Sequence, residues 1–213
     1  MVGMDRSRLW ALIHEERAAM AATLESLTPE EWEHPSLCAG WSVKDVAAHV
    51  ISNPQIGWAQ LPGMLGRNLG RGYNSMIRRE VQRLGATRTP EQVLADFATY
   101  ADSTRHVPVT TAVEPLVDAL VHHQDVLRPL GRSHDPDPEA AAVAADRCRL
   151  LSPLLGGRRL VRGVRMVATD VDWVRGDGPE LTGPVLELLM VCAGRARAAH
   201  GLTGEGTALL PSG

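Results

Sequence analysis

Three side chains able to bind a metal ion stand close together in the second half of this 213-residue chain. Asp118, His122 and Asp125 occupy positions i, i+4 and i+7. In an α-helix this spacing places all three on one face, with the Cβ atoms of Asp118 and His122 about 5–6 Å apart. Carboxylate oxygen and imidazole nitrogen both bind zinc at about 2.0–2.2 Å, so this pair suits two ligands of one divalent ion. A catalytic site of this kind needs a third protein ligand.

His49 is the strongest candidate for the third ligand. It lies seven residues beyond Ser42, which can cap a new helix, and its neighbours on that helix are mostly apolar. Metal sites in helical bundles are built from facing helices in this way. His123 lies about 100° around the helix from His122, so we expect it not to share the ion. The alternative is that His49 is a hydrogen-bonded core histidine and that the helical acid–histidine pair is solvated.

Other polar residues near these positions have two interpretations each. Asp125 and Gln124 either orient His122 or a bound water, or lie on an exposed helix surface. Cys38 precedes the His49 helix in a loop. Its ordinary role is that of a small buried residue, and the alternative places it beside the metal ligands.

The stretch between residues 67 and 88 is strongly basic, because it contains six arginines and only one acidic residue. Within it, Arg78, Arg79 and Arg83 are candidates for an anion site, because the arginine fork matches a carboxylate. The alternative is a solvated helix face. Aromatic residues hardly occur in this stretch, and the net charge of the chain is −3, so we expect no nucleic acid as a partner.

Helical periodicity dominates the chain up to about residue 155. Apolar residues three and four apart predict a long helix over 5–26. First-turn prolines predict that further helices begin near Pro90 and Pro115. The glycine-rich stretch 54–72 predicts short helical pieces with a break.

The last part of the chain has a different pattern. Asp177 and Gly178 form a hairpin-type turn between short strands, and an apolar helix follows over 185–192. We therefore expect two domains, a helical bundle over 1–155 and a small α/β domain over 156–213 that packs on it. The expected strands cover 164–168, 173–174 and 180–182.

The composition is that of a soluble globular protein. Hydrophobic residues make up 44% of the chain and charged residues 22%, and no apolar run reaches the roughly 18–20 residues of a membrane span. The three cysteines form no C-x-x-C pair, so we expect neither a disulfide framework nor a cysteine-based zinc site. These features predict a cytoplasmic protein without a membrane partner, and the apolar helices allow a homodimer.

Two segments carry a resemblance to a known family. Residues 35–49 read PSLCAGWSVKDVAAH, and residues 118–131 read DALVHHQDVLRPLG. Both resemble the mycothiol-dependent maleylpyruvate isomerase family of the DinB-like four-helix superfamily. Residues 168–173, ATDVDW, and 176–184, GDGPELTGP, are similar to its actinobacterial branch. The resemblance spans nearly the whole chain.

The resemblance implies a mainly α fold, namely a DinB-like up-down four-helix bundle with extra helices and a small C-terminal α/β appendage. It also implies a divalent metal, usually zinc, held by His49, Asp118 and His122, and mycothiol as the thiol cosubstrate. The isomerase of this family is similar but has glutamate where this chain has Asp118, which is one methylene shorter.

The reaction implied is thiol chemistry on a small electrophilic substrate. In an isomerase the thiolate adds to a conjugated double bond and leaves after rotation, whereas in a transferase it stays attached. Two alternatives remain open, because fold and metal do not fix a reaction. One is a metal-dependent hydrolase on the same bundle, and the other is a noncatalytic metal-binding or ligand-binding regulatory module.

Overall fold

A computed structural model describes residues 4–211 of the chain. The chain folds into two compact units, and the boundary between them lies between Ser133 and His134. We expected the division near residue 155, at the end of the helix α8 (Pro138–Leu155). That helix packs along α10 (Val185–Cys192) within the second unit. Its alanine-rich pattern predicts a helix correctly, but an apolar stripe does not reveal which unit supplies its partner.

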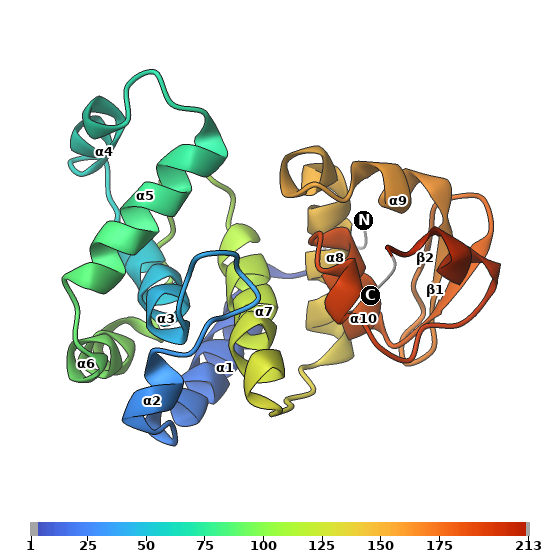
Figure 1. Ribbon diagram of the computed structural model, residues 1–213, viewed down its shortest axis with the longest axis horizontal. Helices are drawn as coiled ribbons and strands as arrows, with labels where there is room; N and C mark the ends of the chain where they lie inside the picture. The colour runs from blue at the N-terminus through green and yellow to red at the C-terminus, as the bar shows by residue number, and fades with distance from the viewer. Residues whose placement is uncertain (1–3, 212–213) are drawn as a thin grey trace. The chain divides into compact units, whose positions relative to one another are not determined.

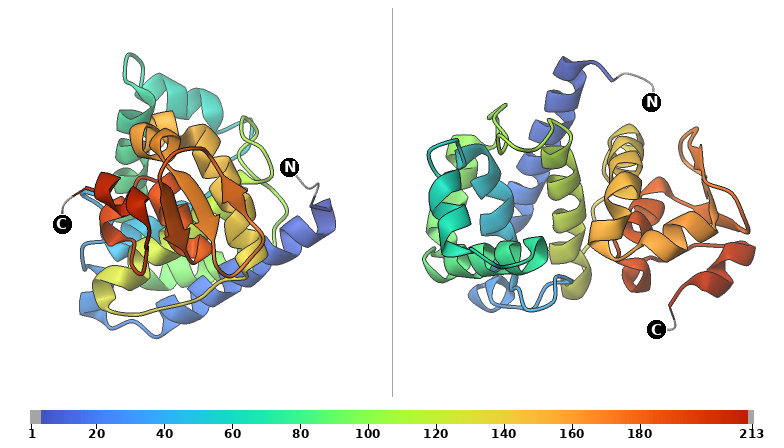
Figure 2. Two further views of the ribbon diagram at one scale, coloured as in Figure 1. Left: turned by 90° about the vertical axis from the view of Figure 1, so that its right-hand side faces the viewer. Right: turned by 90° about the horizontal axis from the view of Figure 1, so that it is seen from above.

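Four helices form the core of the first unit. They are α1 (Arg6–Glu25), α3 (Val43–Ser52), α6 (Pro90–Tyr100) and α7 (Glu114–Leu127). Contacts run from α1 to α7, from α7 to α3, from α3 to α6 and from α6 back to α1, so the four helices close a ring. Figure 1 shows α1 and α7 side by side, and Figure 2 shows the same pair from above.

Two complete capping boxes fix the start of α3 and α6. The Ser42 side chain accepts a hydrogen bond from the backbone of Asp45, whose carboxylate accepts one from the backbone of Ser42. Thr89 and Gln92 do the same for α6. Each box satisfies two backbone N–H groups that the helix itself leaves unpaired. The register of the His49 helix is therefore fixed from its first residue.

Three further α-helices of the described residues belong to this unit. They are α2 (Pro29–Trp32), α4 (Leu61–Arg67) and α5 (Tyr73–Ala86). The short α4 lies in the glycine-rich stretch, as predicted, and α5 packs against α3. Gly85 allows this packing, because a Cβ atom there would overlap the Asp45 carboxylate and lie 3.2 Å from the Asp45 Cα.

The second unit combines α8, α9 (Arg158–Gly163) and α10 with a three-stranded sheet. The strands are β1 (Arg165–Ala168), β2 (Val174–Arg175) and β3 (Glu180–Gly183), in the order β2-β1-β3. The three strands lie side by side in Figure 2. The mainly α fold with a small sheet is confirmed.

The turn predicted at Asp177 and Gly178 does not join neighbouring strands. β2 pairs with β1 in an antiparallel manner, and β3 pairs with the other edge of β1 in a parallel manner. The hairpin prediction was therefore wrong about which strands pair, because a turn signal shows where the chain reverses and not where the next strand docks. Within residues 4–211, no helix is long and apolar enough to cross a membrane.

Candidate metal centre

The facing sides of α3 and α7 bring the three nominated ligands together. One ligand atom each of His49, Asp118 and His122 lies within 4.8 Å of the other two. The two imidazole rings meet edge to face, with centroids 5.1 Å apart and planes at 80°. Asp118 and His122, four residues apart on α7, thus lie next to His49 of α3, as the sequence predicts.

His122 is held in place by a buried carboxylate. Its Nδ1 lies 2.8 Å from Oδ2 of the fully buried Asp125, one turn further along α7. This contact leaves Nε2 as the nitrogen that can bind a ligand. Burial lowers the pKa of His122, but the hydrogen bonds with Asp125 and Cys38 outweigh it and raise the pKa to about 10. In the metal-free protein the ring is therefore a cation paired with Asp125.

His49 has the opposite electrostatic environment. Burial lowers its pKa to about 4, and the nearby charge of His122 acts in the same direction, while Asp118 opposes both. The imidazole is therefore neutral at pH 7, which is the form that binds a metal.

Two further residues surround the ligands. Asn53, four residues after His49, donates a hydrogen bond from Nδ2 to Oδ2 of Asp118 at 2.6 Å. The indole of Trp41 lies 5.5 Å from the His49 ring and 6.1 Å from the His122 ring, measured between centroids. Asn53 thus fixes the carboxylate, and Trp41 places an aromatic ring beside both imidazoles.

The loop between α2 and α3 supplies Trp41 and Cys38. It docks on α7 through the backbone N–H of Leu37, which donates to the backbone oxygen of Asp125 at 3.0 Å. Gly40, at φ +80°, turns the chain so that the Trp41 N–H reaches the Cys38 carbonyl at 2.9 Å. Only glycine adopts this left-handed backbone without strain.

Cys38 lies beside the nominated ligands, which is the second of the two placements that the sequence allows. Its Sγ donates to Oδ2 of Asp125 at 3.1 Å and lies 3.7 Å from Nδ1 of His122. Cys38, His122 and Asp125 also form a group with ligand atoms within 4.8 Å. Hydrogen bonds already link the members of this second group, so it supports His122 instead of competing for an ion.

The donor set of His49, Asp118 and His122 fits a divalent metal. Two imidazoles and one carboxylate match the three protein ligands of a catalytic zinc site, whose fourth position is left open. One imidazole is neutral, and the other is oriented through Nδ1 by a carboxylate, which is the usual support for a zinc-bound histidine.

His123 and Gln124 take separate roles on the same helix. The fully buried His123 places Nδ1 2.7 Å from Oε1 of Glu16 and Nε2 2.9 Å from Oγ1 of Thr23. These bonds tie α7 to α1. Gln124 accepts a hydrogen bond from Nε of Arg128 at 3.0 Å. Of the two residues considered as supports for His122, the one in contact with its ring is Asp125.

The basic stretch lies on the outside of α5. Arg78, Arg79 and Arg83 are all exposed, and Arg83 pairs with Glu80 at 3.1 Å. Arg67 pairs with the same carboxylate, and its hydrogen bond is the main reason that the pKa of Glu80 falls to about 2. Two arginines of this stretch, Arg67 and Arg83, are thus engaged by an acid of the same stretch.

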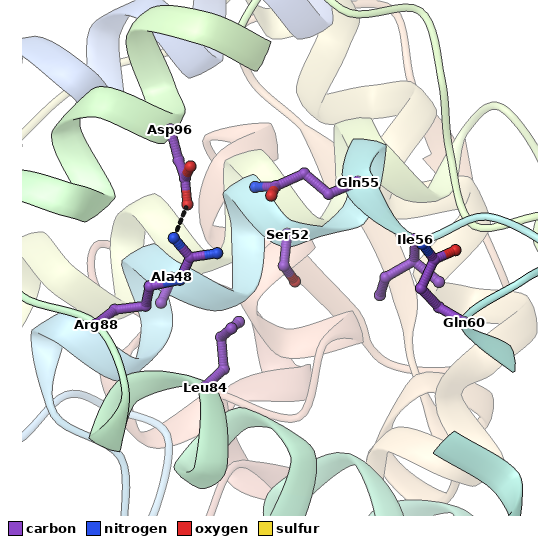
Figure 3. Close-up of a pocket in the computed structure, with 8 residues that line it drawn as sticks. All are labelled: Ala48, Ser52, Gln55, Ile56, Gln60, Leu84, Arg88 and Asp96. Atoms are coloured by element: carbon purple, nitrogen blue, oxygen red, sulfur yellow. Dashed lines mark ion pairs between the residues drawn. The ribbon is translucent and has the colours of Figure 1, made fainter. Parts of the chain in front are cut away.

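A cavity of about 270 Å³ lies against the other side of α3 (Figure 3). Ala48 and Ser52 of α3 line it, together with Leu84 and the ion pair of Arg88 with Asp96, 3.2 Å apart. None of the three nominated ligands is among its lining residues in the described part of the chain. Helical geometry explains this, because Ala48 lies about 100° around α3 from His49.

The sequence reasoning missed Asn53 and Trp41. Asn53 has the i+4 spacing from His49 that would have indicated a shared face. Trp41 carried no such signal, because its position depends on the loop conformation.

Comparison with known proteins gives the same family as the sequence motifs. Residues 13–109 match the family model described as the mycothiol maleylpyruvate isomerase N-terminal domain. A search of curated proteins found no match.

Two solved structures share the fold over almost the whole chain. Both are crystal structures of the mycothiol-dependent maleylpyruvate isomerase, one of them a histidine-to-alanine mutant. The mutant structure is 14% identical, covers 95% of this chain and 93% of its own, and has a TM-score of 0.61. The other is 16% identical, with the same coverage and a TM-score of 0.60. The two structures confirm the expected mainly α bundle fold with its small sheet, and residues 13–109 of this chain are similar to the mycothiol maleylpyruvate isomerase N-terminal domain.

Proposed function

We propose that this protein is a metal-dependent enzyme of thiol chemistry that uses mycothiol either to isomerise a small electrophilic substrate or to attach the thiol to it through sulfur. The observation that carries the proposal is the convergence of His49, Asp118 and His122 between α3 and α7. The family match supports mycothiol as the thiol. Two imidazoles and one carboxylate match the protein ligands of a catalytic zinc site.

Each residue of the site has a defined task in this proposal. His49, kept neutral by burial, offers a nitrogen lone pair. Asp125 holds His122 through Nδ1, and Asn53 holds one oxygen of Asp118. A divalent ion bound there would supply Lewis-acid activation of a thiol at its open position.

The proposal is tested by following the melting temperature of the zinc-loaded protein as mycothiol is added. A ligand that binds only the folded state stabilises it by about 2.7 kcal/mol at one hundred times its Kd. We expect a rise in melting temperature that requires zinc and disappears in Asp118→Asn, which removes the charge at nearly constant shape. Asp102→Asn, at an exposed position, is the matched control and keeps the response.

The second measurement is turnover of a conjugated cis-unsaturated keto acid, read by ultraviolet absorbance with and without mycothiol. The proposal predicts product only when thiol and metal are both present. Bound zinc without any response to thiol would contradict it. Hydrolysis of amides or thioethers without thiol would favour a hydrolase instead.

A further inference from the structure

One face of α1 carries buried nitrogen atoms that the described part of the chain leaves without hydrogen-bond partners. They are Nε1 of Trp10, Nε2 of His14, and both Nε and Nη2 of Arg17. The three residues occupy positions i, i+4 and i+7, so they share one face of the helix. Trp10 is 6% exposed and Arg17 only 1%. A buried polar group without a hydrogen-bond partner destabilises the fold, so this cluster needs an explanation.

Arg17 is the central group of the cluster. Its Nη1 donates to two backbone oxygens, of Ala101 at 3.3 Å and of Ser103 at 3.0 Å. Both acceptors are neutral, and they leave two of the three guanidinium nitrogens unused. Burial lowers the pKa of Arg17 to about 10, against the attraction of Asp118, so the guanidinium is charged at pH 7. A buried cation with two of its three nitrogens unpaired is typical of an anion-binding residue.

The segment that follows α6 encloses this face of α1. Arg17 reaches its backbone at Ala101 and Ser103, and His106 of the same segment stacks on Trp10 with ring centroids 6.4 Å apart. The Trp10 and His14 rings lie 6.0 Å apart. The unpaired nitrogens are therefore gathered between α1 and residues 101–106.

The charge of Asp118 links this cluster to the candidate metal centre. Asp118 is the acid that attracts Arg17. It is also a nominated metal ligand, and a carboxylate that binds a divalent cation offers less of its charge to another cation. Metal binding would therefore weaken the attraction of Asp118 for the buried guanidinium.

We propose that Trp10, His14 and Arg17 form a binding site for one carboxylate group of the substrate, with Arg17 as its principal ligand. The indole and imidazole nitrogens add donors to the guanidinium fork. The substrate class is then a small carboxylic acid whose reacting end lies at the metal. This last step rests on the proposed function, whereas the carboxylate site itself rests on the residues of α1.

Succinate is the probe for the test, and its neutral diamide, succinamide, is the control ligand at equal ionic strength. Calorimetric titration of the wild-type protein is expected to show succinate binding and no succinamide binding. Arg17→Met, which keeps length and removes charge, is expected to weaken succinate binding at least tenfold. Arg105→Met removes an exposed arginine from the covering segment and is expected to leave the affinity unchanged. Equal affinity in wild type and Arg17→Met, or no succinate binding at all, would overturn the proposal.

Two further variants protect the test against a folding failure of Arg17→Met. Trp10→Phe removes a single donor and is expected to weaken succinate binding about threefold to tenfold. Asp118→Asn removes the competing charge, so the metal-free variant is expected to bind succinate more tightly than the metal-free wild type. Unchanged affinity in both would show that the cluster does not bind carboxylates.

The same titrations separate this inference from the proposed function. Succinate binding that depends on Arg17 in a protein unable to hold zinc would sustain the carboxylate site and refute the metal enzyme. Zinc binding with no affinity for succinate would sustain the metal site and refute the carboxylate site.

Discussion

Asp125 is the residue whose removal most directly exposes how His122 is positioned. It is fully buried and contacts the His122 ring at 2.8 Å, while its backbone oxygen holds the loop that carries Cys38. We predict that Asp125→Asn weakens zinc binding by about 10–100-fold, the usual loss when a carboxylate support of a zinc-bound histidine is removed. Competition with a chelating dye measures this affinity.

His123→Gln is the matched control for that experiment. His123 is equally buried on the same helix but binds Glu16 and Thr23. Its substitution is expected to change the stability and leave the zinc affinity within about twofold. An equal loss of zinc in both variants would show that Asp125 acts only through the fold.

The protonation of His122 makes a second prediction at the residue scale. Its pKa of about 10 in the folded protein lies above the ordinary histidine value of 6.5, which applies to the unfolded chain. The native metal-free protein therefore holds this proton more tightly than the unfolded chain does. The resulting stabilisation is fully present below pH 6.5 and is lost as the pH rises towards 10.

Urea unfolding of the metal-free protein between pH 6.5 and 10 checks this sign. The free energy of unfolding is expected to fall more steeply with pH in the wild type than in Asp125→Asn, which lacks the carboxylate that binds the imidazolium. Parallel slopes in the two proteins would contradict the assignment.

At the scale of elements, the capping box of α3 connects stability with metal binding. Ser42→Ala is expected to lower the free energy of unfolding by about 1 kcal/mol, the usual effect of removing such a cap. It is also expected to weaken zinc binding, because α3 carries His49. Thr89→Ala breaks the equivalent box of α6, which carries no nominated ligand.

The comparison of these two variants in urea and zinc titrations is decisive. Similar losses of stability with a loss of zinc affinity only in Ser42→Ala are the expected result. Unchanged zinc affinity in both would mean that packing alone positions His49.

The contact between α5 and α3 gives another prediction. Alanine normally favours a helix over glycine by about 1 kcal/mol. At Gly85, however, the new Cβ would meet Asp45, including its Cα atom, which cannot rotate away. Gly85→Ala is therefore expected to lower the melting temperature, whereas Gly66→Ala in α4, which meets no atom within 4 Å, is expected not to lower it. A higher melting temperature for Gly85→Ala would refute this packing.

Local signals explain which elements the sequence predicted. Ser42, Thr89 and Pro115 mark helix starts through backbone chemistry within four residues, and all three lie at the expected starts. The order of the three strands and the division after Ser133 depend on contacts between distant segments. No local pattern contains that information.

At the scale of the whole molecule, the candidate metal centre combines both kinds of information. Asp118 and His122 were predictable as a pair because one helix fixes their spacing. His49 required the expectation that two helices face each other, and the ring of helices places α3 against α7. The sequence carries no such signal for Arg17. Its two unpaired nitrogens can be recognised only once the surrounding residues of the fold are known.

The proposed metal centre holds one divalent ion on His49, Asp118 and His122. Elemental mass spectrometry of the purified protein, after reconstitution with zinc and removal of excess, tests it most directly. We expect close to one zinc per chain in the wild type and in His123→Ala, and none in His49→Ala or His122→Ala. Equal loss of zinc from all three variants, or no zinc in the wild type, would contradict it.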